Sequence, residues 1–171
     1  MARIKPKQHV PELTLPTVDG SSFDLRANDP QHFSMLVFYR GLHCPVCKKY
    51  LGELEAKLPQ FEALGVKPVA ITTETRERAQ RTVSEWSLAK LSVAYGLPID
   101  EARKWGLYVS HAIRDGEPAV FSEPGLFLVR PDMTLQYAAI NSGSRGRPGI
   151  DDMLGAIQFM VDKNAPPRGE A

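Results

Sequence analysis

The chain has 171 residues, of which 43% are hydrophobic and 24% charged, and its 21 Lys and Arg nearly balance its 20 Asp and Glu for a net charge of +1. This length fits one domain that can bury its own core, and the neutral balance predicts no general attraction to nucleic acid or to an anionic membrane. The N-terminus has no apolar stretch typical of a secretory signal, and the apolar run Met35 to Tyr39 is too short to cross a bilayer. We therefore expect a cytoplasmic protein.

The N-terminal part of the chain has clear sequence signals for its first strands and helix. Short β signals at 13–15 and 22–25 flank a Val-Asp-Gly-Ser turn and predict a small hairpin. A continuous apolar run at 35–39 predicts a buried parallel strand. Apolar residues at helical spacing over 50–61 predict the next helix, which Pro59 should bend or break near its end.

Strand and helix signals continue to the C-terminus. They predict, in order, a strand at 66–73, a charged surface helix at 74–88, a short helix from Pro98, strands at 119–122, 125–129 and 134–140, and a helix at 150–161. This order favours an α/β fold with a mixed central sheet, helices on both faces and an N-terminal β-hairpin. We predict a single domain over 1–163 and a disordered tail at 164–171.

The only two cysteines, Cys44 and Cys47, lie where the first central strand should end and the first helix begin. Open α/β sheets place their functional sites at this edge. The helix N-terminus, with Arg40, Lys48 and Lys49 nearby, favours a thiolate over a thiol. Because reversible thiol chemistry needs a reactive sulfur and a resolving sulfur within reach, we predict a catalytic dithiol. A zinc site would need two further ligands, and the sequence offers none at suitable spacing, so no metal is expected. The other alternative is that both cysteines are inert core thiols.

The chain resembles the alkyl hydroperoxide reductase and thiol-specific antioxidant (AhpC/TSA, peroxiredoxin) family of the thioredoxin-like superfamily. The resemblance covers about residues 8–162 and is carried by the segments PELTLPTVDG from Pro11, Phe38-Tyr39 before the cysteines, VKPVAITTET and GLFLVRPDMTLQYAA. On the family pattern Pro-x-x-x-(Thr or Ser)-x-x-Cys, Cys47 matches the peroxidatic cysteine, Cys44 the Thr and Arg40 the Pro. The resemblance implies a thioredoxin-like fold.

The departures from the family pattern point toward thioredoxins. The family's late-strand arginine, three residues before a Phe, falls on Pro124. In a thioredoxin alignment, Cys44 and Cys47 match the Cys-x-x-Cys pair, and Pro124 matches the cis-proline that lies against the disulfide. We therefore expect a peroxiredoxin-like scaffold with a thioredoxin-type dithiol and a cis Pro124.

By resemblance, the chain is a thiol-dependent oxidoreductase that reduces hydroperoxides and forms a Cys44–Cys47 disulfide. No cofactor is expected beyond an external thiol reductant such as a thioredoxin or glutathione system, and a homodimer is expected by analogy. Either Cys44 attacks, as in thioredoxins, or Cys47 attacks, as in peroxiredoxins. The alternatives are a thioredoxin-like disulfide reductase with Cys44 as nucleophile and a non-enzymatic binding module that senses redox state.

Neighbouring residues support the pair. Arg40 either stabilises the thiolate or is a solvated charge, and His43 either titrates beside Cys44 or has no role. Pro45 lies within the motif, and Tyr39 should pack in the core with its hydroxyl satisfied. We interpret the loop 141–149 as a connection to the last helix.

The alternative interpretation of that loop is that Arg145 or Arg147 approaches the active site or a partner.

Overall fold

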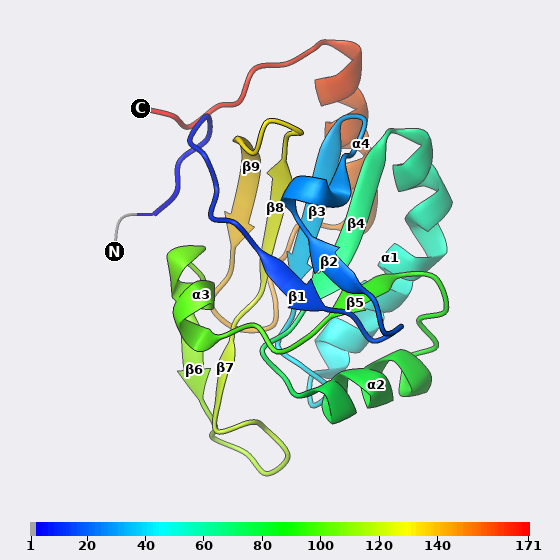
Figure 1. Ribbon diagram of the computed structural model, residues 1–171, viewed down its shortest axis with the longest axis vertical. Helices are drawn as coiled ribbons and strands as arrows, with labels where there is room; N and C mark the ends of the chain where they lie inside the picture. The colour runs from blue at the N-terminus through cyan, green and yellow to red at the C-terminus, as the bar shows by residue number, and fades with distance from the viewer. Residues whose placement is uncertain (1–2) are drawn as a thin grey trace.

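The computed structural model describes residues 3–171. Its elements are β1 (Thr14–Pro16), β2 (Ser22–Asp24), the 3₁₀ turn η1 (Arg26–Asn28), β3 (Phe33–Phe38), α1 (Pro45–Ala63), β4 (Val66–Ile71), α2 (Arg76–Glu85), β5 (Ser92–Ala94), α3 (Ile99–Lys104), β6 (Val109–His111), β7 (Val120–Ser122), β8 (Gly125–Val129), β9 (Leu135–Ile140) and α4 (Ile150–Asp162). This α/β arrangement confirms the predicted fold class (Figure 1).

A five-stranded mixed sheet forms the centre of the molecule, in the order β5-β4-β3-β8-β9. Strand β3 pairs in parallel with β4 and antiparallel with β8, so it lies in the middle of the sheet. All six of its residues are buried, as the continuous apolar run predicted. The carboxyl end of β3 therefore emerges from the most deeply packed part of the fold.

Two layers cover the sheet (Figure 1). Helices α1, α2 and α4 pack on one face, where alternate β3 residues such as Met35 and Val37 meet Leu51 and Leu54 of α1. The predicted hairpin β1–β2 and helix α3 cover the other face, around Phe38, Trp105 and Phe127. Both cysteines belong to the first of these two cores.

Three local predictions need correction. Helix α1 continues past Pro59 to Ala63, because Leu58 and Phe61 on either side of the proline are buried and hold the last turn on the sheet. Helix α2 is shorter at both ends than the predicted 74–88. The short strands β5 and β6, of three residues each, were not predicted, since such short elements depend on their pairing partners β4 and β7.

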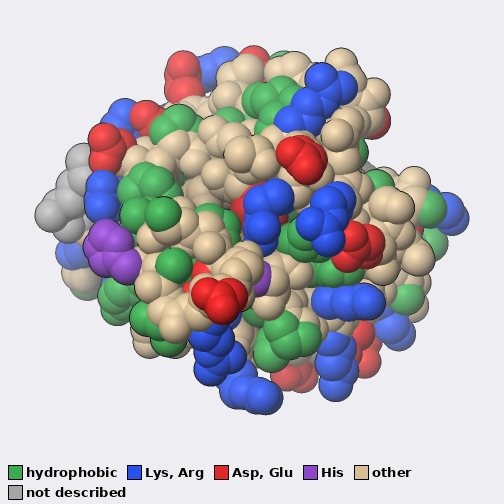
Figure 2. All heavy atoms as spheres, turned by 90° about the horizontal axis from the view of Figure 1, so that it is seen from below, with side chains coloured by type: hydrophobic (Ala, Val, Ile, Leu, Met, Phe, Trp, Pro, Cys, Tyr) green, Lys and Arg blue, Asp and Glu red, His purple; other side chains and the backbone are tan. Residues whose placement is uncertain are grey.

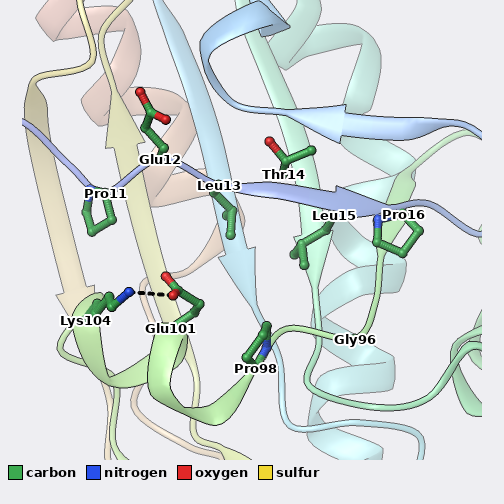
Figure 3. Close-up of a pocket in the computed structure, with 10 residues that line it drawn as sticks. All are labelled: Pro11, Glu12, Leu13, Thr14, Leu15, Pro16, Gly96, Pro98, Glu101 and Lys104. Atoms are coloured by element: carbon green, nitrogen blue, oxygen red, sulfur yellow. Dashed lines mark hydrogen bonds and ion pairs between the residues drawn. The ribbon is translucent and has the colours of Figure 1, made fainter.

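A hollow of about 670 Å³ lies on the hairpin face, on the side of the sheet away from the two cysteines. Figure 3 shows it between the N-terminal strand and α3, with an ion pair of 2.6 Å between Lys104 Nζ and Glu101 Oε1 on one wall. Its lining includes Leu13, Leu15 and Pro98. We assign it no part in the thiol chemistry.

The C-terminal segment passes beside the N-terminal segment that the structure describes (Figure 1). Pro167 is buried, and Lys7 Nζ pairs with Glu170 Oε1 at 3.1 Å. The carbonyl of Ala165 accepts hydrogen bonds from Arg130 and Gln136. The structure thus gives the segment 164–171 defined contacts, while its assignment as a separate tail stays a prediction.

Within residues 3–171, no helix combines the length and the apolar composition needed to cross a membrane.

Candidate active site: a cysteine pair at a helix N-terminus

The two cysteines lie where β3 leads into α1, as the sequence predicted. The backbone turns at Gly41, whose carbonyl accepts a hydrogen bond from the Cys44 N–H at 3.1 Å. The positive φ of Gly41, 143°, lies in the range that favours glycine. A side chain at this position would also collide with the buried carboxylate of Glu74. Cys44 is the N-cap of α1 and Pro45 its first residue, a position where the missing proline N–H costs no helical hydrogen bond.

Cys44 is the more acidic of the two thiols. Its pKa is lowered to about 6, first by a hydrogen bond from the Cys47 thiol, then by the Cys47 backbone N–H and by Arg40. The backbone N–H of Cys47 lies 3.2 Å from Cys44 Sγ, which is the contact that an N-cap side chain makes. The lowered pKa makes Cys44 a thiolate at neutral pH.

Cys47 has the opposite protonation preference. It is fully buried, and burial raises the pKa of its thiol; its role as hydrogen-bond donor to Cys44 raises it further. The guanidinium of Arg147 opposes this effect from 2.8 Å, measured from Nη2 to Cys47 Sγ. At neutral pH the pair therefore consists of a Cys44 thiolate and a Cys47 thiol, both free and in hydrogen-bond contact.

Arg147 reaches Cys47 from the loop that joins β9 to α4. Its guanidinium lies over the ring of Tyr50, 5.1 Å from the ring centroid, and the Tyr50 hydroxyl donates a hydrogen bond of 2.7 Å to the carbonyl of Pro148. Burial raises the pKa of Tyr50 to about 12, so the hydroxyl keeps its proton. The loop is thus more than a connection: the alternative interpretation holds for Arg147.

Arg40 and His43 both lie beside Cys44. Arg40 lowers the pKa of the Cys44 thiol and pairs with Glu123, with 2.9 Å between Nε and Oε2. His43 has only 7% of its side chain exposed, and its ring meets Phe121 edge-on at 4.8 Å. Burial lowers the pKa of His43, as does the charge of Arg40, so its ring is neutral at pH 7.

Glu74 is a buried carboxylate that sequence reasoning did not single out. Its side chain is 0% exposed; it accepts the Leu42 N–H at 3.0 and 3.1 Å and pairs with Arg78 Nε at 2.7 Å. It lies 4.0 Å from His43 Nδ1. Glu74 therefore fixes the loop before Cys44, and no local pattern around it in the sequence indicates this role.

Tyr39 packs in the core against Trp86, with 5.9 Å between ring centroids, as predicted. The prediction that its hydroxyl is satisfied was wrong: this buried oxygen has no hydrogen-bond partner among residues 3–171. The ring occupies a packed part of the core, where its size rather than its hydroxyl determines the fit.

Pro124 does not have the thioredoxin-type geometry. None of the peptide bonds in the described part of the chain is cis, so the expected cis Pro124 was wrong. The carbonyl of Pro124 accepts the backbone N–H of Asn141 at 3.0 Å, which extends the β8–β9 ladder by one residue. Pro124 lines a small cavity with Tyr50 and Arg147 and does not line the pocket beside Cys44.

A pocket of about 270 Å³ opens over Cys44. It is bounded by the first turn of α1, by the tip of the β6–β7 hairpin and by the loop after β9; its lining is Arg40, His43, Cys44, Pro45, Val46, Arg114, Asp115, Glu117, Ser144 and Arg145. Figure 2 views the molecule from the end at which β3 terminates, and Lys and Arg side chains gather near the middle of this face with acidic groups between them. Cys47 is not part of the lining, so a small molecule reaches the pair at Cys44.

No cluster of three or more His, Cys, Asp or Glu side chains suited to a metal ion occurs within residues 3–171.

A thioredoxin-like fold with a cysteine pair at the mouth of its first long helix defines a class of thiol-based redox proteins. The model of the AhpC/TSA family matches residues 6–138, and the chain belongs to that family. A probable 1-Cys peroxiredoxin from Syntrichia ruralis is 26% identical over 133 residues, which cover 75% of this chain. The chain spans 61% of the length of that relative.

Solved structures show the same fold. The peroxidoxin BcpB of Mycobacterium tuberculosis superposes with a TM-score of 0.75 over 92% of this chain and 99% of its own, at 14% identity. The peroxiredoxin Q of Xanthomonas campestris superposes with a TM-score of 0.69 over 87% of this chain and 91% of its own, at 21% identity. These matches confirm the predicted thioredoxin-like fold.

Proposed function

We propose that this protein is a thiol peroxidase in which Cys44 attacks the hydroperoxide and Cys47 resolves the product. The observation that carries the proposal is the asymmetry of the pair: Cys44, with its pKa lowered to about 6, lines the pocket, while Cys47, with its pKa raised, lies behind it. The thiolate is the nucleophilic form of cysteine. Membership of the AhpC/TSA family supports peroxide as the substrate.

The reaction follows from this arrangement. The Cys44 thiolate attacks one peroxide oxygen, the O–O bond breaks, and the second oxygen takes a proton and leaves as an alcohol or water. Cys44 is then a sulfenic acid. The sulfur of Cys47 attacks the sulfur of Cys44, the S–O bond breaks, and the proton of Cys47 leaves with the hydroxyl group as water. The product is a Cys44–Cys47 disulfide.

The positive groups have separate roles in these steps. Arg40, which lines the pocket with Cys44 and lowers its pKa, stabilises the attacking thiolate and the negative charge that develops on the peroxide oxygens. Arg147, at 2.8 Å from Cys47 Sγ, stabilises the thiolate that Cys47 becomes as it attacks. Because the family's arginine position is Pro124 in this chain, Arg40 is the guanidinium that lines the pocket beside the attacking sulfur.

The test is a single-turnover reaction. Reduced protein mixed with one equivalent of hydrogen peroxide should lose both free thiols and two hydrogen atoms in mass, and consumption of further peroxide should require an added thiol. A protein that keeps both thiols under these conditions would refute peroxidase activity.

A thioredoxin-like disulfide reductase is the second candidate, because the same low pKa of Cys44 suits attack on a disulfide. The trans peptide at Pro124 removes the specific support that the sequence offered for it. Reduction of insulin by a protein that is inert to peroxide would establish this candidate. If the pair reacts with neither substrate, the remaining hypothesis is a non-enzymatic protein that senses redox state.

We further propose that an external thiol, of the thioredoxin or glutathione type, reduces the disulfide after each turnover. A homodimer and a cytoplasmic location stay predictions. Light scattering at micromolar concentrations tests the first, and fractionation of the source cells tests the second.

A further inference from the structure

The walls of the pocket over Cys44 are fixed by side-chain contacts. Arg78 Nη2 donates a hydrogen bond of 2.9 Å to the carbonyl of Gly116 at the hairpin tip. The carboxylate of Glu117 accepts the backbone N–H groups of Ile113 and Arg114 at 2.8 and 3.2 Å. These hydrogen bonds therefore hold the walls of the pocket in a defined conformation.

The guanidinium groups around the pocket differ in how they are paired. Arg40 already pairs with Glu123 and lies 3.9 Å from Glu117. Arg114 and Arg145 have no carboxylate within 4.0 Å in the part of the chain that the structure describes, and both are exposed at the rim. Two unpaired guanidinium groups beside one reactive sulfur make a site for a ligand that carries a carboxylate.

A buried polar group without a partner also faces this pocket. His43 lines it with only 7% of its side chain exposed, and neither ring nitrogen has a hydrogen-bond partner among residues 3–171. Buried polar atoms are rarely left without a partner. A polar ligand in the pocket would supply one.

The dimensions and charge of the pocket favour a small ligand over a protein surface. Its volume of about 270 Å³ is near the lower end of small-molecule sites. Cores of protein–protein interfaces are depleted of charged side chains, whereas three arginines and two carboxylates line this approach to Cys44. A protein dithiol would have to bury these charges in order to reach Cys44, a residue that is 1% exposed.

We propose that the pocket binds a carboxylate-bearing low-molecular-weight thiol, which reduces the Cys44–Cys47 disulfide; this rests on the proposed function for the origin of the disulfide. The ligand's thiolate attacks Cys44 Sγ, the S–S bond breaks, and Cys47 leaves as a thiolate beside Arg147 and takes up a proton. A second thiolate attacks the ligand sulfur of the mixed disulfide and releases the Cys44 thiolate. Two thiols are oxidised to one disulfide, and the protein disulfide is reduced to two thiols.

The experiment measures the reductive half-reaction alone. The protein is oxidised with diamide, so the test does not depend on its reactivity with peroxide. The rate of disulfide reduction is then compared for 3-mercaptopropionate and 2-mercaptoethanol, two thiols of similar size that differ in the carboxylate, at equal thiolate concentration. Reduced glutathione and a thioredoxin are run in parallel.

We expect the carboxylate thiol to react about tenfold faster than the neutral thiol, with the advantage falling as ionic strength rises. The ratio of the two rates should fall toward one in the double variant Arg114→Gln, Arg145→Gln. The matched control Arg168→Gln removes the same charge in the C-terminal segment and should keep the ratio.

Equal rates for the two thiols in the wild-type protein would overturn the proposal, as would a ratio that survives in the double variant. Thioredoxin reducing the disulfide faster than glutathione, with no effect of the double variant, would overturn it in favour of a protein reductant. Failure of the single-turnover peroxide test with a normal thiol ratio would instead refute the proposed function and leave the pocket assignment intact.

Discussion

The surroundings of Cys44 and Cys47 differ although the residues are three positions apart. Cys44 faces a charged pocket, accepts a hydrogen bond from the helix N-terminus and has its pKa lowered by Arg40. Cys47 belongs to the apolar core, and the guanidinium of Arg147 lies 2.8 Å from its sulfur. One helical turn therefore separates a sulfur that lies beside the pocket and is ionised from one that lies behind it and is protonated. This difference assigns the order of events in a reaction that local sequence leaves open.

The strongest test of this comparison exchanges each sulfur for oxygen. Cys44→Ser should lower peroxide reduction to background, because the enclosed Cys47 lacks both access and a lowered pKa. Cys47→Ser should keep the first step and accumulate a sulfenic acid on Cys44, since no resolving sulfur is present. Trapping with a dimedone-type reagent and mass spectrometry locate the sulfenate. A sulfenate on Cys47 in Cys44→Ser would reverse the assignment.

Removing the charge beside Cys47 should slow the second step. Arg147→Gln takes away a charge-assisted hydrogen bond, so we expect disulfide formation from the Cys44 sulfenate to slow by about 10- to 100-fold. Rapid-mixing measurement of sulfenate decay checks this rate, while the initial oxidation of Cys44 should change less. Arg168→Gln is the control. An equal loss in both steps would show that Arg147 acts on the pair as a whole.

The pH dependence distinguishes the groups near Cys44. Because its folded-state pKa is about 6, its alkylation by iodoacetamide should rise with pH around that value and level off above it, as protons leave the thiol. Arg40→Gln removes a positive group that lowers the pKa of Cys44 and should move the midpoint up toward the ordinary value for cysteine, about 8.5. The control variant Lys49→Gln removes the charge of an exposed lysine near the start of α1, and it should shift the midpoint much less. A wild-type midpoint at the ordinary cysteine value would contradict the thiolate assignment.

The smallest effect should come from removing the hydrogen bond between Tyr50 and Pro148, next to Arg147. Tyr50→Phe keeps the ring under the guanidinium but removes the hydrogen bond to Pro148, so we expect disulfide formation to slow by about fivefold or less. The same sulfenate-decay measurement checks it. A loss as large as that of Arg147→Gln would show that this hydrogen bond, rather than the ring, positions the loop.

Much of the fold was predictable because its signals are local. The buried strand β3 followed from its continuous apolar run, and the hairpin β1–β2 from its turn residues. Strands β5 and β6 were missed because they depend on their pairing with β4 and β7. The prediction of a cis Pro124 was wrong because it came from a likeness to thioredoxins and not from residues around the proline.

The sequence by itself determined the position of the two thiols at a strand-to-helix junction and their separation within one helical turn, because both depend only on neighbouring residues. Only the tertiary structure decided which charges meet each sulfur. Arg147 is 100 residues from Cys47 along the chain, and Glu123 is distant from Arg40, so no local spacing indicates either contact. The chain brings these groups together only when β8, β9 and the following loop pack beside β3 and α1. The different environments of the two sulfurs are therefore a property of the packed fold, while the pair itself is a property of the sequence.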